Sequence, residues 1–571
     1  MTRRATHLAL TTRLLALSCL GLLAGNLASA QTSVLTFHND NQRTGLNAAE
    51  TVLDPDLLNG KVTSKSFGSL GTVTLDEQVD AQPLVWASKT AVTFPNGKSA
   101  AEVAYVVTEN NTVYAIDASR SSYDNTAILN SKNLGTAVPL SKCNNNSSVV
   151  GINSTPVIDP DGQTIYVVSY QVQGTGQAYY LYALGLDLTV KDSIQIKGSA
   201  GKVSFQPALQ RQRAALLYSA HSQLITVGFA SFCDQQAAGW VFALPRLGTN
   251  GKFPATGDDT YLIDQKFPTA TLSSVWMSGD GIAEGPLPDS KGVHALYFLT
   301  GNTTTGQYDP NLNPANSLVK LSAALAPEGH FTPANETTLD QNDWDFAAGG
   351  IVLADPTFRY ARREGTTGRR ILTSVSFLQA YGAGKDGTLY SIDRESLKAS
   401  ANPPTIGSCH CAPSAFPGAD GDIRIVTSSA KNDGDNTTTV REFKVEPVLN
   451  STGVPVDTKL ALLASWSMPG QVQNDGGGFT AVSTNQNANG SGIIWALRRA
   501  VPNATPNQDA VITLYALMPG SLAQLGPSAG WTAGQWPANS GANANLVPTV
   551  ANAHVFVGSY KLLQVFGVLS H

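Results

Sequence analysis

The feature that most constrains the fold is a two-part repeat that recurs along nearly the whole chain. Each copy begins with a short apolar strand and passes through a polar turn. It then continues with an aromatic or apolar residue, a small residue and an aliphatic residue, often followed by Asp. In the first copy, residues 104–107 lead through Glu109-Asn110-Asn111 to residues 114–117. Two short strands around a tight polar turn predict a β-hairpin for each copy.

Eight such copies are present, at irregular intervals. The paired segments are 104–107 with 114–117, 164–168 with 182–184, 224–227 with 240–244, 295–298 with 318–321, 377–378 with 385–393, 423–426 with 443–445, 493–497 with 514–517, and 555–557 with 563–567. One small sheet cannot bury both of its faces alone, whereas radial stacking of sheets buries them and leaves only short edges. We therefore expect an all-β propeller; an array of β-sandwiches is the alternative interpretation.

The two ends of the chain predict how such a ring would close. A lone strand-like run, residues 80–86, precedes the first copy, and the last copy, residues 546–566, is complete close to the C-terminus. A ring closes when strands from both ends share a blade, and this arrangement could supply that blade. Because no Pro/Gly/Ser-rich linker divides the copies, we expect one propeller domain over residues 31–571.

The first thirty residues form a separate element. Arg3, Arg4 and Arg13 precede or border an apolar run over 14–24, and Ala28-Ser29-Ala30 supplies the small residues of a cleavage site. This pattern predicts a secretory signal peptide over residues 1–30, with cleavage before Gln31. Cys19 permits a lipoprotein interpretation, but the residues before it make a poor lipidation motif. We expect an exported protein without a transmembrane segment, periplasmic or extracellular.

Composition excludes some partners. The formal net charge is −5 and only 14% of residues are charged, and removal of the arginine-containing signal peptide takes the charge to about −8. A mildly acidic surface argues against nucleic acid as a partner, because phosphate binding needs a basic face. Abundant Gly, with 52 residues, suits short strands and tight turns better than helical bundles.

Several segments resemble those of the pyrroloquinoline-quinone-like β-propeller proteins of the quinoprotein alcohol dehydrogenase-like superfamily. They are His38-Asn39-Asp40-Asn41-Gln42-Arg43-Thr44-Gly45, Ala81-Gln82-Pro83-Leu84, 105–117, 151–159, Val275-Trp276-Met277-Ser278-Gly279, 547–551 and 555–557. The likeness covers nearly the whole mature chain. Within the superfamily, the chain most resembles exported bacterial members. It implies an eight-bladed ring. It implies less about function, since such rings host redox enzymes, scaffolds and binding modules.

The resemblance also implies a quinone cofactor and calcium, and several of the motifs for them are missing. Quinone dehydrogenases of this superfamily carry two adjacent cysteines, whereas this chain has Cys409-His410-Cys411 with a residue between them. The recurrent tryptophan-docking repeat is absent from the ends of the blades, and no Cys-x-x-Cys-His haem motif occurs. The residues therefore establish no cofactor, and pyrroloquinoline quinone with calcium stays an alternative.

Four cysteines remain in the mature chain: Cys143, Cys233, Cys409 and Cys411. An even number in an exported protein favours disulfides over a metal site, with three possible pairings. A bridge between Cys409 and Cys411 would close a very small, strained loop, which leaves Cys143 or Cys233 as alternative partners, and the pairing stays undetermined. The metal alternative, with Cys409, His410 and Cys411 as ligands, lacks the second spaced pair that zinc sites usually have.

Acidic residues suggest a second metal hypothesis. Asp340, Asp343 and Asp345 surround Trp344, and Asp420 and Asp422 flank Gly421. Carboxylates with amides suit calcium, which takes six to eight oxygen ligands. Neither run matches the twelve-residue calcium loop, and Asp-Gly pairs are ordinary turn residues.

The sequence favours a binding or scaffold protein with a ligand site on a loop face or at the central channel. Candidate ligand-binding residues are His221, Asp234, Trp240, Trp276 and Asp280, which lie in or beside long segments between strands. A small molecule, a glycan or a peptide would suit Asn/Gly-rich loops with tryptophans. The alternative is a periplasmic quinone- and calcium-dependent oxidoreductase acting on alcohols or sugars. No catalytic residue is predicted, and whether the protein is an enzyme stays open.

Overall fold

The structure is a computed structural model, and it describes residues 31–571 with several gaps. The gaps are 141–146, 234–236, 255–258, 267–271, 291, 293, 365–368, 431–436, 470–476, 499–509, 538–544 and 571. The signal peptide expected over residues 1–30 also lies outside the described residues. Residues 31–571 form a single compact unit.

Eight antiparallel sheets follow one another along the chain, and we number them as blades 1 to 8. Blade 1 holds β3 (Leu84–Thr93), β4 (Ser99–Val107), β5 (Thr112–Asp117) and β6 (Ile128–Asn133), and blade 2 holds β9 (Val157–Asp159), β10 (Thr164–Gln173), β11 (Gly176–Gly185) and β12 (Val190–Gln195). Blade 3 holds β15 (Gln210–Arg211), β16 (Leu217–Ser219), β17 (Leu224–Ser231), β18 (Trp240–Pro245) and β19 (Asp259–Leu262), and blade 4 holds β20 (Ala283–Glu284), β21 (Leu296–Leu299), β22 (Leu318–Leu321) and β23 (Pro327–Phe331).

The second half repeats the arrangement. Blade 5 holds β24 (Ile351–Ala354), β27 (Gln379–Gly382), β28 (Tyr390–Asp393) and β29 (Lys398–Ala399), and blade 6 holds β30 (Ser414–Pro417), β31 (Ile423–Ala430), β32 (Thr438–Leu449) and β33 (Pro455–Ser467). Blade 7 holds β1 (Leu46–Asn47), β34 (Thr480–Ser483), β35 (Ile493–Arg498), β36 (Ala510–Leu517), β37 (Gln524–Leu525) and β38 (Trp531–Trp536), and blade 8 holds β39 (Thr549–Ala551), β40 (His554–Ser559), β41 (Leu562–Ser570) and β2 (Lys65–Thr74).

The expected eight-bladed all-β propeller is confirmed; the sequence repeats fall on the middle hairpins of the blades, except that residues 377–378 of the fifth repeat lie just before β27. In blade 2, for example, β10 and β11 pair without interruption from Thr164↔Gly185 to Gln173↔Gly176. Val, Ile and Tyr residues along both strands favour this extended pairing. Gly174, with a φ of +56°, allows the two-residue turn between them.

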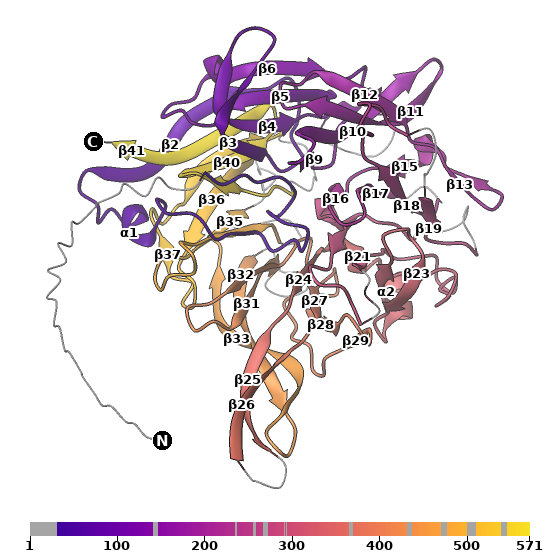
Figure 1. The fold of residues 1–571 in the computed structure, drawn as a ribbon, viewed down its shortest axis with the longest axis vertical. Coiled ribbons are helices and arrows are strands. Elements are labelled where there is room, and N and C mark those ends of the chain that lie inside the picture. The colour runs from indigo at the N-terminus through magenta and orange to yellow at the C-terminus, as the bar shows by residue number, and fades with distance from the viewer. Residues whose placement is uncertain are drawn as a thin grey trace, which may run out of the picture. The chain divides into compact units, whose positions relative to one another are not determined.

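The ring is closed by strands from both ends of the chain, as expected, but the N-terminal strand is a different one. Residues 80–86 were expected to close it; instead they lead into β3, the first strand of blade 1. The closing strand is β2, which pairs with β41 from Lys65↔Ser570 to Thr74↔Leu562, and Figure 1 shows these two strands side by side. Gly68, Gly71 and a bulge between Ser69 and Gly71 weaken the strand pattern in the sequence.

The first strands of the blades line the centre of the ring. In blades 2 to 7, each first strand contacts the first strand of the next blade. In order around the ring, from blade 2 to blade 8, these strands are β9, β16, β20, β24, β30, β34 and β39. The apolar core lies mainly between neighbouring sheets; one cluster, for example, joins Tyr179 and Leu181 of blade 2 to Phe229 and Phe242 of blade 3. Figure 1 shows the sheets arranged around the central axis.

The segment before the closing strand crosses the centre and touches every blade. We call residues 34–50 the N-terminal plug. Backbone hydrogen bonds join it to Val85 of blade 1, Ile158 of blade 2, Glu284 of blade 4, Leu353 of blade 5, Ala415 of blade 6 and Val482 of blade 7. Side chains complete the circle: Asn41 donates to the carbonyl of Tyr218 in blade 3, and Asn47 donates to that of Val550 in blade 8. The bonded residues lie within or at the ends of the first strands, so the plug closes this end of the channel.

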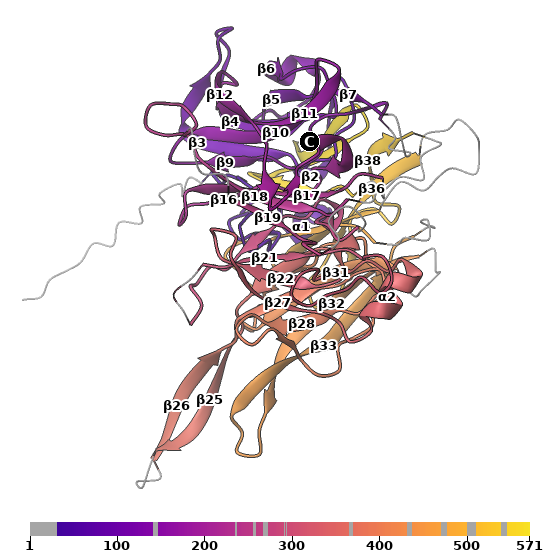
Figure 2. The same cartoon turned by 90° about the vertical axis from the view of Figure 1, so that its right-hand side faces the viewer.

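Other elements lie outside the blades. The short helix α1 (Pro55–Leu58) follows the plug and is capped by the Asp54 side chain, and α2 (Glu336–Asn342) lies between blades 4 and 5. The hairpin of β25 (Thr357–Glu364) and β26 (Arg369–Ser376) extends away from the ring in Figure 2. Two more small pairs join β7 (Val138–Pro139) to β8 (Val149–Val150) and β13 (Ser199–Ala200) to β14 (Val203–Ser204). Among the described helices, none combines the length and hydropathy of a membrane span.

Candidate functional site at the second end of the channel

The middle of the channel is filled by side chains. Phe37 of the plug packs with Ala215, Ala412, Phe479 and Val547, which come from blades 3, 6, 7 and 8. His38 stacks on the Phe37 ring with centroids 4.5 Å apart. This cluster is buried, and the first strands begin at the opposite end of the channel from the plug. We call this opposite end the second end of the channel.

A buried arginine holds the plug in place. The guanidinium of Arg43 donates to the carbonyls of Ile282 (2.7 and 3.1 Å), Phe37 (3.1 Å) and Leu216 (3.2 Å) and to the hydroxyl of Thr36 (2.7 Å). Burial lowers the pKa of Arg43 to about 10, although attraction by Asp280 opposes this. The group therefore stays charged at neutral pH.

Asp280, one of the sequence-predicted ligand residues, is a partner of this arginine. It is completely buried, and its carboxylate accepts hydrogen bonds from the backbone N–H of Gly281 and of Ile351, both at 2.7 Å. Burial raises its pKa to about 7, while the charge of Arg43 opposes that rise. Asp280 therefore serves the structure at the centre of the ring, where it accepts backbone hydrogen bonds from blades 4 and 5.

At the second end, one group of buried polar residues lies on the side of blades 1 to 3. Glu109 accepts hydrogen bonds from Arg211 (3.2 Å), from Asn153 (2.7 Å) and from the backbone of Gly151 (2.7 Å). Asn153 also donates to Asp80 at 2.6 Å. Burial raises the pKa of Glu109 to about 8, opposed by Arg211 and reinforced by Asp80. Glu109, Arg211, Asn153 and Asp80 therefore form one buried, hydrogen-bonded polar group.

A second polar group lies on the side of blades 4 and 5, and we call it the Asp345–Lys385 cluster. The Lys385 Nζ is 2.8 Å from Asp345 Oδ2 and 3.1 Å from Asp343 Oδ2. Asn302 donates its backbone N–H to Asp345 (2.9 Å) and its side-chain amide to Asp343 (2.8 Å). Burial lowers the pKa of Lys385, but attraction by Asp345 and Asp343 outweighs it and leaves the pKa raised. The Asp343 side chain is 77% exposed, so the cluster reaches the surface.

Local backbone geometry creates this cluster. Helix α2 ends at Asp343, which adopts a left-handed φ of 56°, and Asp345 caps the 3-10 turn η4 (Phe346–Ala348). Lys385 lies in the turn between β27 and β28. These segments belong to blade connections that are distant in sequence, and the ring brings them to one edge.

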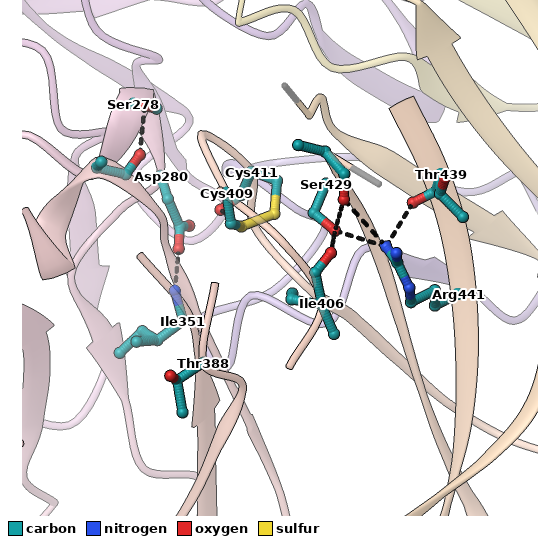
Figure 3. The surroundings of a disulfide bond; sticks show 12 residues. Ser278, Asp280, Ile351, Thr388, Ile406, Cys409, Cys411, Ser429, Thr439 and Arg441 are labelled. Carbon is teal, nitrogen blue, oxygen red and sulfur yellow. Dashed lines mark hydrogen bonds between the residues drawn. A yellow bond between two sulfur atoms is a disulfide. The ribbon is translucent and has the colours of Figure 1, made fainter. Parts of the chain in front are cut away.

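Trp276, another sequence-predicted residue, lies beside the same turn. It is half-buried and immediately precedes the 3-10 turn η3 (Met277–Gly279), which contacts η4. The Ser278 hydroxyl donates to the carbonyl of Ala348 and ties the two turns together (Figure 3). Met277 and Ser278 have positive φ values of 51° and 50°, a strained conformation that persists where surrounding structure enforces it. Trp276 therefore directly precedes a turn that is tied to η4, the turn that begins after Asp345.

The cysteines depart from the sequence-based expectation. The structure joins Cys409 and Cys411 to each other, with Cα atoms 5.1 Å apart, although the small size of the loop favoured partners elsewhere. Figure 3 shows the pair between Asp280 and Ser429. The loop is accommodated because the Cys409 N–H donates to the carbonyl of Gly384 and the Gly350 N–H donates to that of Cys411. Cys233 is disulfide-bonded, and Cys143 lies outside the described residues.

The remaining sequence-predicted residues are dispersed. His221 is exposed at the end of the channel that carries the plug, and its ring stacks on that of His294 with centroids 3.6 Å apart. Trp240 is buried between blades 2 and 3 with Phe205 and Phe242. Asp234 lies outside the described residues. Among the described residues of these five, Trp276 immediately precedes η3, which contacts the turn that begins after Asp345.

Calcium was suggested from the sequence by Asp340, Asp343 and Asp345, and the described donor atoms do not form a site for it. Asp345 and Asp343 are paired with Lys385, and Asp340 accepts from the Thr303 backbone and the Asn316 amide. Burial and the neighbouring Glu336 raise the pKa of Asp340 to about 8. In the described part of the chain, no three His, Cys, Asp or Glu side chains are grouped to bind a metal. Calcium needs six to eight oxygens, so no step through calcium follows from these residues.

Comparison with known proteins supports the fold. No protein-family model matches the chain, and no curated protein sequence is significantly similar to it. A quinohemoprotein alcohol dehydrogenase of Pseudomonas putida HK5 has the same fold, with 12% identity, a TM-score of 0.53 and coverage of 94% of this chain and 80% of that one. A europium-containing methanol dehydrogenase is 11% identical, with a TM-score of 0.51 and coverage of 94% and 98%. The expected eight-bladed propeller fold is therefore confirmed.

Proposed function

We propose that the mature chain is an exported propeller that binds a small polyhydroxylated ligand, of the saccharide class, at the second end of its channel. The observation that carries this proposal is that the N-terminal plug closes the other end of the channel. Because the plug contacts all eight blades and Phe37 fills the axis, we place the ligand at the opposite end, where the Asp345–Lys385 cluster is partly exposed.

The groups at the second end suit such a ligand. Carboxylate, amide and ammonium groups of Asp343, Asn302 and Lys385 offer both acceptors and donors for hydroxyl groups. The half-buried indole of Trp276 supplies an apolar face with a polar edge. A few fixed polar groups beside an aromatic surface are typical of small-ligand sites.

Thermal unfolding with a panel of monosaccharides and disaccharides tests the proposal. A ligand present at one hundred times its Kd stabilises the folded state by about 2.7 kcal/mol. We expect at least one sugar to raise the Tm of the wild-type protein, and the rise to disappear in Asp345→Asn and Lys385→Met. Asp56→Asn, at an exposed ion pair with Lys61, is the matched control and should keep it.

The same assay distinguishes the binding proposal from the alternative, a quinone- and calcium-dependent oxidoreductase. If no sugar raises the Tm while pyrroloquinoline quinone with calcium raises it strongly and supports turnover of alcohols, the binding proposal is wrong.

Export of the protein and oxidation of its cysteines are tested on protein recovered outside the cytoplasm. We propose that its first residue is Gln31 and that its mass under non-reducing conditions shows Cys409 and Cys411 oxidised.

A further inference from the structure

A pocket of about 460 Å³ lies between blades 6 and 7. Phe416 to Ala419, at the turn after β30, form one wall. The opposite wall comes from two loops of blade 7, over 487–492 and 518–520. Its volume lies in the range of small-molecule sites, and it shares no residue with the Asp345–Lys385 cluster.

The floor of this pocket carries a buried carboxylate that lacks one hydrogen-bond donor. The Glu442 side chain is 1% exposed, and its Oε2 accepts from the Gly520 backbone at 2.6 Å. Its Oε1 has no hydrogen-bond partner among the described residues. The nearest cation, Arg424 Nε, is 3.8 Å away, beyond hydrogen-bonding distance.

The charge of Arg424 is committed elsewhere. Its Nη2 lies 2.7 and 2.6 Å from the two carboxylate oxygens of Asp420, which forms the rim of the pocket. Asp420, Arg424 and Glu442 are the charged lining residues, and Lys444 also pairs with Asp420 at 3.0 Å, so Glu442 is the lining carboxylate that no cation reaches within hydrogen-bonding distance. A buried acceptor without a donor is costly, and a ligand that brings a charged donor removes that cost.

The other walls define the rest of the ligand. Phe416, Pro417, Met518 and Pro519 contribute apolar surface above the carboxylate. From this geometry we infer that the pocket binds a primary alkylammonium group. The ammonium donates to Glu442 Oε1, and the short carbon chain lies against the apolar wall. The site is independent of the proposed saccharide site.

The methionines make this inference directly measurable. The sequence has four, Met1, Met277, Met468 and Met518, and three of them belong to residues 31–571. Met518 lines the pocket, whereas Met277 is fully buried in a cluster around blade 4 and Met468 is buried beside blades 6 and 7. NMR of the mature protein labelled with ¹³C-methyl methionine therefore gives one reporter for the pocket and two internal controls, with Met518→Leu assigning the pocket signal.

The probe is n-butylamine, and N-butylacetamide is its uncharged control. We expect millimolar n-butylammonium to shift the Met518 signal saturably without moving that of Met277, and N-butylacetamide to leave Met518 unchanged. In Glu442→Gln the apparent Kd should rise by about tenfold or more, a loss of about 1.4 kcal/mol. Glu446→Gln, on the same strand but exposed and paired with Lys459, should keep wild-type binding.

Either of two results would overturn the inference. The first is a Met518 signal that n-butylamine does not move. The second is a shift of equal size and concentration dependence in Glu442→Gln or with N-butylacetamide. Unchanged Met277 and Met468 signals in Glu442→Gln verify that the variant is folded, so the loss of a Met518 response is not confused with unfolding.

Discussion

At the scale of single residues, the fold depends on a guanidinium group at the axis. Arg43 is fully buried and its donors meet carbonyls from the plug, from blade 3 and from the start of blade 4. A planar group with several fixed donors can serve these acceptors together, and an ammonium group cannot. We expect Arg43→Met to lower the free energy of unfolding by about 3–5 kcal/mol, because it leaves buried acceptors and Asp280 without their cation.

Urea unfolding followed by tryptophan fluorescence measures this loss. The matched control is Arg359→Met, at an exposed position on the projecting hairpin β25–β26; we expect its effect to stay within about 0.5 kcal/mol. Equal stability of the two variants would contradict the role of Arg43 in holding the plug.

His38 predicts a pH dependence. Burial lowers its pKa from 6.5 to about 4, so the unfolded chain binds a proton in this interval while the folded protein does not. Stability contributed by the neutral ring is therefore present above pH 6.5 and is lost as the pH falls toward 4, by up to about 3 kcal/mol. Buried Asp280, whose pKa is raised, acts in the opposite direction, so a comparison with His38→Gln is needed.

We expect the stability difference between the wild-type protein and His38→Gln to shrink as the pH is lowered from 6.5 to 4. Denaturant unfolding at a series of pH values measures it. A difference that is constant across this range would mean that the ring of His38 is protonated in the folded state.

Individual site residues were the hardest to predict from the sequence. Trp240 and Asp280 were proposed as ligand residues from their place in long segments, and the structure buries both. Asp345 and Lys385 were noted separately, as part of an acidic run and of a turn, and their contact depends on the curvature of the ring. Arg211 and Glu109 form an ion pair across 102 residues of sequence. No local spacing in the sequence encodes such pairs. Charged residues just before an inner strand could, however, be used to predict which residues lie at this end of the channel.

At the scale of elements, the middle hairpins were predictable and the inner and closing strands were not. The hairpins have long alternating β-branched and aromatic strands. Several first strands are only two to four residues long, such as β20, Ala283–Glu284, and β39, Thr549–Ala551, too short to leave a periodic pattern. The closing strand β2 was missed because its two glycines interrupt that pattern.

Gly71 in that closing strand joins blade 8 to blade 1. It has a φ of +127°, and a Cβ there would lie 2.1 Å from the carbonyl oxygen of Tyr123. We expect Gly71→Ala to destabilise the protein by about 1–3 kcal/mol, because both the backbone conformation and the contact become strained. Thermal and urea unfolding measure the loss. Gly176→Ala, where an added methyl meets ordinary contact distances only, should change stability by about 0.5 kcal/mol or less.

If Gly71→Ala matched Gly176→Ala in both measurements, the close approach of blade 8 to blade 1 at this point would not exist. The result would then favour a ring that closes through β41 alone, without the pairing of β2.

At the scale of the whole molecule, the ring of eight sheets would have an open channel at both ends without the N-terminal plug. The plug removes one of its two mouths, since residues 34–50 take part in hydrogen bonds with all eight blades. The sequence indicated this segment only as part of a family resemblance. Its bonds to six of the blades join backbone carbonyls and N–H groups, which any residue can supply, so the sequence does not reveal its path.

Hydrogen exchange of the plug tests this account most directly. Amide exchange of the mature protein, followed by mass spectrometry of peptides covering residues 31–50, reports whether these N–H groups are bonded within the folded protein. We predict protection comparable to that of the inner strands β24 and β34, persisting until global unfolding. Exchange of these amides at the rate of an unfolded peptide would contradict the closed first end, and with it the assignment of ligand access to the second end.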